Sequence, residues 1–146
     1  MARSSIVIPT RGGAERLPVL LACLKAQTDP NWQAVVVIDG DIDGSAAVVR
    51  SCGDDRVTVV VFHENRGRVA ALNAGFTAAD GDILIRCDDD LRPAPDFVSG
   101  HRSAHAGKTV GVIGLYRNVY PETPYATVYG REMDKVFRKD AYATDA

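Results

Sequence analysis

The stretch NRGRVAALNAGFTAADGDILIRCDDD, residues 65–90, contains the pattern that decides the fold. Its first part, GRVAALNAGFTAAD, is rich in alanine and predicts a helix over 67–80. The next part, GDILIRC, predicts a short apolar strand over 81–87. A helix that leads directly into an apolar strand is typical of an α/β protein with a parallel sheet.

The same alternation of strands and helices continues on both sides of this stretch. The other predicted strands span 4–10, 32–39, 56–63 and 109–116, and the other predicted helices span 14–28, 45–52 and 94–107. Strands that are apolar on both faces are typical of parallel sheets covered by helices on both sides. We therefore expect a mostly parallel, open α/β sheet of five strands with helices on both faces.

The alternation ends near Gly114. Residues 117–146 contain two prolines and mixed charge, and they predict an irregular segment followed by a helix around 132–141. The sequence therefore predicts an α/β core over residues 1–116 and a separate segment over 117–146.

Composition excludes several classes of protein. The 146 residues suit one domain, and the net charge of −2 without a long basic run argues against a nucleic-acid partner. The sequence contains no stretch of about 20 apolar residues, so it predicts no transmembrane segment. The apolar run near the N-terminus is too short for a signal peptide. The odd number of cysteines, three, argues against a disulfide framework, so we expect a cytoplasmic protein.

Polar residues follow each of the first four predicted strands. They are Pro9 to Gly13, Asp39 to Gly44, His63 to Arg68, and Asp88 to Asp90. Because the carboxyl ends of parallel strands lie at the same edge of the sheet, these four segments are expected to lie together. Open parallel sheets bind their ligands at this edge. Carboxylates, arginines and glycines at one edge suit a metal-bound phosphate ligand that carries a base and a sugar.

The acidic triplet Asp88-Asp89-Asp90 has two interpretations. If the backbone stays extended, Asp88 and Asp90 project to the same side and form a hard oxygen site, which suits Mg²⁺ or Mn²⁺. Alternatively, the triplet caps a solvated loop and is neutralised by Arg86 and Arg92. Spacing alone leaves both interpretations open.

Two other features also have two interpretations each. Arg66 and Arg68 precede a predicted helix, where arginine and backbone N–H groups suit a diphosphate, although surface salt bridges would explain them equally. Asp39 could accept hydrogen bonds from a base or a ribose, or it could cap the following helix.

Taken together, these segments resemble the family-2 glycosyltransferases over about residues 5–100. SIVIPTRGGAERLPVLLACLKAQT is similar to the opening strand, turn and helix of that family, and VVVIDGDIDGS is similar to a shortened nucleoside-binding segment. The stretch over residues 65–90 is the strongest match. It carries Asn65, Gly67, Asn73, Gly75 and Gly81 at family spacing and ends on the D-x-D motif at Asp88 and Asp90.

The resemblance implies a GT-A fold, which is Rossmann-like, in a short or truncated form. It also implies metal-dependent, inverting transfer of a sugar from a nucleotide donor, most simply a UDP-sugar, to an acceptor hydroxyl, with Mn²⁺ or Mg²⁺ as cofactor. The implied donor-binding residues are Pro9, Thr10, Arg11, Glu15, Asp39, Asp41, Asn65, Arg68, Asn73, Asp88 and Asp89, and the implied metal ligands are Asp88 and Asp90.

Three departures from the family pattern limit what the resemblance implies. Arg11 and Gly12 stand where many relatives have an aromatic residue and an asparagine, and Leu72 stands where many have an arginine. The acceptor half of the family normally follows well beyond D-x-D, so the catalytic base is unassigned. We therefore expect a donor-binding core, a truncated chain, or a compact member completed by a partner subunit or a second copy.

Two alternative functions remain open at this stage. The segment IPTRGGAERLP also resembles the opening loop of the cytidylyltransferases that activate acidic sugars, so a sugar nucleotidyltransferase is one alternative. A nucleotide-sugar-binding module without catalytic activity is the other, because no base is assigned.

Overall fold

The computed structural model describes residues 2–142, with side chains through Lys139. Contacts within the chain divide it into two compact units, residues 1–110 and 111–146. Each unit is described by itself below.

The first unit is built on a four-stranded sheet. Its strands are β1 (Ser4–Thr10), β2 (Trp32–Asp39), β3 (Val57–Phe62) and β4 (Ile83–Arg86), in the order β3-β2-β1-β4. Every neighbouring pair is parallel, with Ile6 opposite both Ala34 and Ile85 in the register. The predicted parallel α/β sheet is therefore confirmed, with bounds close to those expected for these strands.

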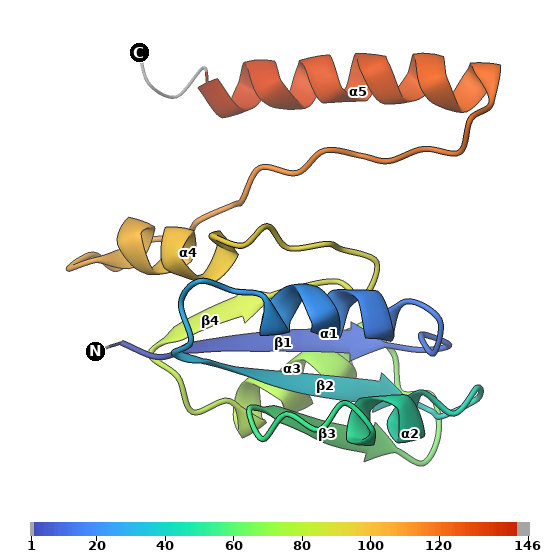
Figure 1. Cartoon of the computed structure of the whole chain (residues 1–146), viewed down its shortest axis with the longest axis vertical. Helices are drawn as coiled ribbons and strands as arrows, with labels where there is room; N and C mark the ends of the chain where they lie inside the picture. The colour runs from blue at the N-terminus through green and yellow to red at the C-terminus, as the bar shows by residue number, and fades with distance from the viewer. Residues whose placement is uncertain (1, 143–146) are drawn as a thin grey trace. The chain divides into compact units, whose positions relative to one another are not determined.

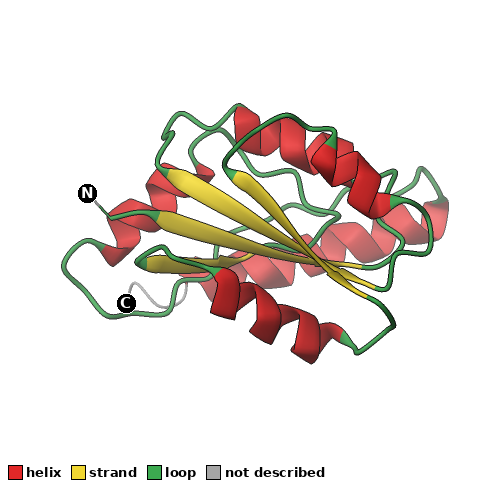
Figure 2. Ribbon diagram, turned by 90° about the horizontal axis from the view of Figure 1, so that it is seen from below, coloured by secondary structure: helices red, strands yellow, loops and turns green. Residues whose placement is uncertain are grey.

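Helices cover both faces of this sheet (Figures 1 and 2). They are α1 (Leu17–Lys25), α2 (Ser45–Arg50), α3 (Arg68–Ala78) and α4 (Phe97–His105). On one face, buried side chains of α1, α2 and α4 pack with those of the strands. On the other face, Ala71 of α3 packs with Val35 and Val37 of β2. Since β1 and β2 are buried on both faces, the middle of each strand, residues 6–8 and 34–38, is continuously apolar.

Helix α3 lies unusually close to the sheet because of Gly75. A Cβ atom at this position would lie 2.2 Å from Cγ1 of Val7 and 3.2 Å from Cγ2 of Val37. Only a residue without a side chain allows this approach, which explains why a glycine stands within this alanine-rich helix.

The second unit differs from the prediction. Residues 109–116 form no strand, so the predicted fifth strand is wrong. The apolar run in this segment has strand character, but a strand also needs a pairing partner, and Gly111 and Gly114 weaken its intrinsic preference. The last helix, α5 (Pro124–Tyr142), is longer than the predicted 132–141. Within this unit, the rings of Tyr116 and Phe137 are 4.4 Å apart between centroids.

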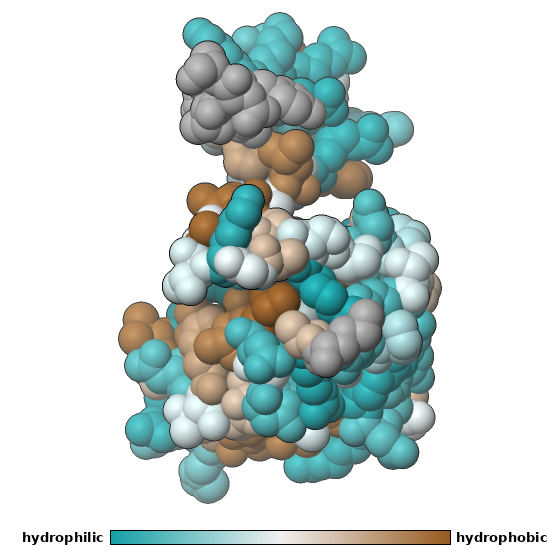
Figure 3. Space-filling view, turned by 90° about the vertical axis from the view of Figure 1, so that its left-hand side faces the viewer, coloured by the Kyte–Doolittle hydropathy of each residue, from teal (hydrophilic) through white to brown (hydrophobic). Residues whose placement is uncertain are grey.

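Hydrophobic side chains reach the surface of both units (Figure 3). In the first unit they include Val61, Leu84 and Val69, and in the second Ile113, Val128 and Val136. Within residues 2–142, no helix combines the length and apolar character needed to cross a membrane.

Candidate active site

The parallel sheet brings four loops to one edge, which we call the carboxyl edge. The strands end there at Thr10, Asp39, Phe62 and Arg86. The loop that follows each strand carries the polar residues singled out from the sequence.

The loop after β1 is attached to the acidic triplet through Asp89. The hydroxyl of Thr10 donates a hydrogen bond to Oδ2 of Asp89 at 2.5 Å. Arg16 donates from Nε to Oδ1 at 3.1 Å and from Nη2 to Oδ2 at 2.8 Å, which is a bidentate ion pair. Asp89 raises the pKa of Arg16 through this hydrogen bond and its charge. The middle carboxylate of the triplet is therefore turned toward the first loop.

Asp88 and Asp90, the outer carboxylates, have different environments. Asp88 forms an ion pair with Arg86 at 3.1 Å, as the loop-cap interpretation predicts. Asp90 is exposed and has no hydrogen bond or ion pair among the described residues. No contact joins Arg92 to the triplet in that part of the chain.

The backbone of the triplet does not stay extended. Strand β4 ends at Arg86, and the N–H of Leu91 donates to the carbonyl of Asp88 at 3.3 Å, which closes a turn over 88–91. The alternation of side chains along a strand therefore does not apply to Asp88 and Asp90. The argument that an extended backbone places both carboxylates on one side, ready for a metal ion, does not hold. Within this turn, Asp89 bonds to Thr10 at the end of β1 and to Arg16, which directly precedes α1.

The loop after β2 is attached to the first loop through Asp43 and Ser45. The N–H of Ala14 donates to Oδ2 of Asp43 at 2.9 Å, and the N–H of Gly13 donates to Oγ of Ser45 at 3.1 Å. The hydroxyl of Ser45 donates to Oδ1 of Asp43 at 2.6 Å. These hydrogen bonds, first that of Ser45 and then that of Ala14, hold the pKa of Asp43 below its usual value.

Asp39 attaches the loop after β2 to the loop after β3. Its two carboxylate oxygens accept hydrogen bonds from the N–H groups of Arg66 at 2.6 Å and Gly67 at 2.9 Å. Asn65 also accepts from the N–H of Gly67 through its side-chain oxygen at 3.1 Å. These hydrogen bonds order the start of α3. Because Asp39 is only 6% exposed, it has little surface left to contact a ligand.

Several charged side chains at the carboxyl edge are exposed and make no hydrogen bond or ion pair among the described residues: Arg11, Glu15, Asp41, Arg68 and Asp90. Arg66 lies over the ring of Phe62, 4.9 Å from its centroid. Pro9 is half-buried, and Asn73 is exposed in the middle of α3, away from the helix end that faces the loops. The carboxyl edge thus presents positive and negative side chains that have no hydrogen-bond or ion-pair partner among the described residues.

Reasoning from sequence missed Arg16, and it left Asp43 and Ser45 outside the candidate set. Arg16 directly precedes α1, while its partner Asp89 is 73 positions later, and nearer arginines competed as partners. The signal that points to Arg16 is its place directly before Leu17, a fully buried residue that fixes the start of α1.

Cys87 directly precedes the triplet in the chain and is fully buried. Burial, together with the negative charges of Asp88, Asp90 and Asp89, raises the pKa of its thiol to about 12. The three cysteines are free thiols.

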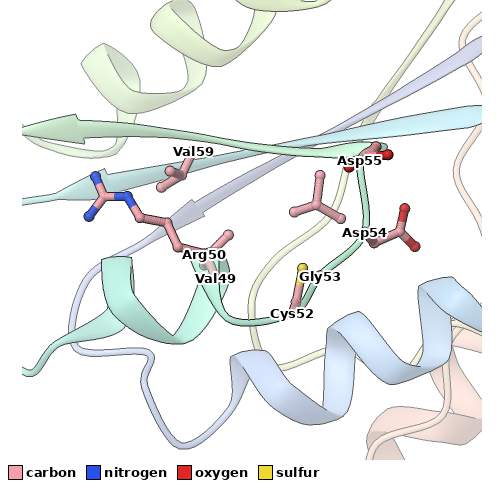
Figure 4. A pocket seen from close by; sticks show the side chains of 8 residues that line it. Val49, Arg50, Cys52, Gly53, Asp54, Asp55 and Val59 are labelled. Carbon is pink, nitrogen blue, oxygen red and sulfur yellow. The ribbon is translucent and has the colours of Figure 1, made fainter.

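A separate hollow lies at the opposite end of β3, between the end of α2 and the loop over 52–55 (Figure 4). It has a volume of about 370 Å³ and is lined by Arg50, Cys52, Asp54, Val57 and their neighbours. None of the predicted site residues borders it. Across residues 2–142, no group of three or more histidine, cysteine or carboxylate side chains is arranged to hold a metal ion.

Comparison with known proteins gives consistent results. The family described as "Glycosyl transferase family 2" matches residues 5–143. An undecaprenyl-phosphate 4-deoxy-4-formamido-L-arabinose transferase of Pectobacterium carotovorum is 31% identical; the match covers 96% of this chain and 41% of that protein. The chain thus spans less than half the length of this relative.

Two solved structures have a similar fold. A mannosyltransferase from Pyrobaculum calidifontis, in complex with GDP-Man and Mn²⁺, matches with a TM-score of 0.64 and 29% identity, over 72% of this chain and 33% of that one. Staphylococcus aureus TarS, residues 1–349 with UDP-GlcNAc, matches with a TM-score of 0.64 and 22% identity, over 69% of this chain and 30% of that one.

Proposed function

Because the chain belongs to glycosyl transferase family 2 and has the GT-A fold, we propose that it binds a nucleotide-sugar donor at the carboxyl edge and takes part in sugar transfer. The observation that carries this proposal is the meeting of four strand ends at one edge, where charged side chains of both signs are uncommitted. Such an edge suits a ligand that has both an anionic part and a polar base.

The donor would lie across the loops after β1, β2 and β3. Arg11 and Glu15 would border the base together with Pro9 and Thr10, and Asp41 would approach the ribose. Arg68, at the N-terminus of α3, would approach the diphosphate, where the free N–H groups of the helix add to its charge. Asp39 would act mainly through the backbone N–H groups that it orients, with Asn65 beside them.

A divalent cation would bind at the acidic triplet together with the donor phosphates, because the side chains of the described residues do not form a metal site by themselves. Mg²⁺ and Mn²⁺ are held in nucleotide sites by one or two carboxylates, with phosphate oxygens and waters as the other ligands. Asp90, which has no partner among the described residues, would be the main ligand, and Asp88 would be the second after leaving Arg86. When bound, such a cation supplies Lewis-acid stabilisation of the diphosphate leaving group.

The reaction consistent with this site is a single displacement. The acceptor oxygen forms a bond to the anomeric carbon, and the bond from that carbon to the diphosphate oxygen breaks with its electrons going to the diphosphate. Attack opposite to the leaving group inverts the configuration. Arg68 would hold the diphosphate in line and offset the charge that it gains.

A phosphate acceptor is a specific version of this proposal. The Pectobacterium relative is named for an undecaprenyl-phosphate acceptor. A hydroxyl acceptor needs a base to remove its proton, whereas a phosphate monoester, with a second pKa of about 6, is largely deprotonated at neutral pH. A phosphate acceptor would therefore make an assigned base unnecessary. The cytoplasmic location expected from the cysteines stays a prediction.

The test is thermal unfolding with UDP, GDP, dTDP and CDP, each with and without Mn²⁺. We expect one nucleotide with Mn²⁺ to raise the melting temperature by about 5 °C or more at roughly 100 times its dissociation constant. No shift with any nucleotide would refute donor binding.

Incubation with the sugar derivative of the selected nucleotide then separates an enzyme from a binding module. Release of the nucleoside diphosphate supports an enzyme. Release of pyrophosphate from the corresponding triphosphate would instead support a nucleotidyltransferase, and binding without any turnover would support a module.

A further inference from the structure

The middle carboxylate of the triplet accepts three hydrogen bonds, from Thr10 at the end of β1 and from Arg16. Oδ1 of Asp89 accepts from Arg16, and Oδ2 accepts from both Arg16 and Thr10. The Asp89 side chain is 15% exposed. Asp89 therefore has little capacity left to bind a ligand directly, and its role differs from that of the exposed Asp90.

The donor side of this contact is fixed by the fold. The N–H of Arg16 donates to the carbonyl of Gly13 at 3.0 Å, and the carbonyl of Arg16 accepts from the N–H of Leu20 at 3.3 Å. Arg16 is thus the N-cap residue of α1, a helix whose buried leucines pack in the core. A side chain on such an element is placed more precisely than one on a loop.

Gly13 shows how tightly the same contact is packed. A Cβ atom at position 13 would lie 2.1 Å from Oγ1 of Thr10 and 2.9 Å from Oδ2 of Asp89. The absence of a side chain at Gly13 leaves the space in which Thr10 and Asp89 meet.

We propose that Arg16 is a positioning residue, which acts through Asp89 to fix the turn over 88–91 and thereby holds Asp90 in place for the metal–nucleotide complex. The inference rests on the proposed function. Arg16 lies outside the donor-binding set inferred from sequence, and it would touch neither the donor nor the metal.

A purely electrostatic role for Arg16 makes the opposite prediction. Removing the guanidinium adds one net negative charge beside the triplet, and that charge would attract Mn²⁺ more strongly. A positioning role predicts weaker Mn²⁺ binding in spite of the added charge, because Asp90 would lose its fixed orientation. The sign of the change therefore distinguishes the two roles.

The experiment measures Mn²⁺ affinity by electron paramagnetic resonance, with saturating nucleotide chosen from the panel described above. We expect Arg16→Gln to weaken Mn²⁺ binding by about tenfold, the lower end of the loss that follows removal of outer-shell support for a metal site. Arg16→Lys keeps the charge but cannot form the bidentate pair, so we expect a loss of about threefold or more. Thr10→Val, which removes one donor to Asp89, should also weaken binding.

Arg50→Gln is the matched control, because Arg50 is exposed at the end of α2 and makes no ion pair among the described residues. It should bind Mn²⁺ as the wild type does. Circular dichroism and melting without ligand establish that each variant is folded; if Arg16→Gln does not fold, Arg16→Lys and Thr10→Val decide the question.

Unchanged or tighter Mn²⁺ binding in Arg16→Gln, or wild-type affinity in both Arg16→Lys and Thr10→Val, would overturn the positioning role and leave the proposed function intact. A wild-type protein that binds no Mn²⁺ with any nucleotide would overturn the positioning role and the metal site, whereas donor binding is decided separately by the melting shift without metal.

Discussion

Asp39, at the end of β2, accepts a hydrogen bond from the backbone N–H of Gly67, which directly precedes α3. A second bond, from Arg66, goes to the other carboxylate oxygen. One side chain therefore joins two loops that are 28 residues apart and orders the start of a helix.

We expect Asp39→Ala to lower the free energy of unfolding by about 1–3 kcal/mol, because two backbone N–H groups lose a charged acceptor. Urea denaturation measures the change. Asp41→Ala is the control, since this exposed carboxylate makes no hydrogen bond or ion pair among the described residues, and it should change stability by less than about 0.5 kcal/mol. Equal effects in the two variants would contradict a role for Asp39 in joining the loops.

Gly75→Ala should destabilise the protein by about 1–3 kcal/mol, because the added methyl group would overlap Val7 and push α3 away from the sheet. Gly100→Ala in α4 is the matched control: a Cβ there meets no atom within 4 Å, so alanine should be neutral or stabilising by up to about 1 kcal/mol. Thermal unfolding of both variants checks the prediction. A neutral Gly75→Ala would show that α3 can move without cost.

Cys87 should not react with Ellman's reagent in the native protein at pH 8. Its thiol has a pKa raised to about 12, so almost none of it is the reactive thiolate until the pH approaches that value, and the side chain is also buried. Cys23 and Cys52 are only half-buried and should react first. All three thiols should react in denaturant, and Cys87→Ser should leave native labelling unchanged. Rapid labelling of Cys87 in the native protein would contradict the burial of its side chain.

Asp90→Asn should remove the Mn²⁺-dependent part of the nucleotide-induced rise in melting temperature and keep any part seen without metal. The substitution keeps the shape of the side chain and removes its charge, which a hard cation needs. Asp55→Asn changes an exposed carboxylate at the other end of the sheet and should have no such effect. A full Mn²⁺-dependent shift in Asp90→Asn would exclude Asp90 as the main ligand.

The sequence predicted the strands of the sheet well because burial on both faces makes the middle of β1 and of β2 continuously apolar. The prediction failed at 109–116, because an apolar pattern indicates that a segment favours a strand but does not show whether another strand is available to pair with it. The carboxyl edge was predictable from the order of elements. The contacts within it were not, because Arg16 and Asp89 are 73 positions apart and Arg86 and Arg92 stood closer to the triplet in the chain.

The buried or bonded residues of the carboxyl edge hold the loops, and a different set of residues faces outward. Asp39, Asp43, Ser45 and Asp89 are occupied by contacts within the protein, while Arg11, Asp41 and Arg68 contribute no such contact among the described residues. The outward-facing positions can therefore be exchanged without loss of folding, and under the proposed function such exchanges would change the preferred donor. For engineering, saturation libraries confined to Arg11, Asp41 and Arg68 should retain mostly folded members, whereas libraries at the bonded positions should not.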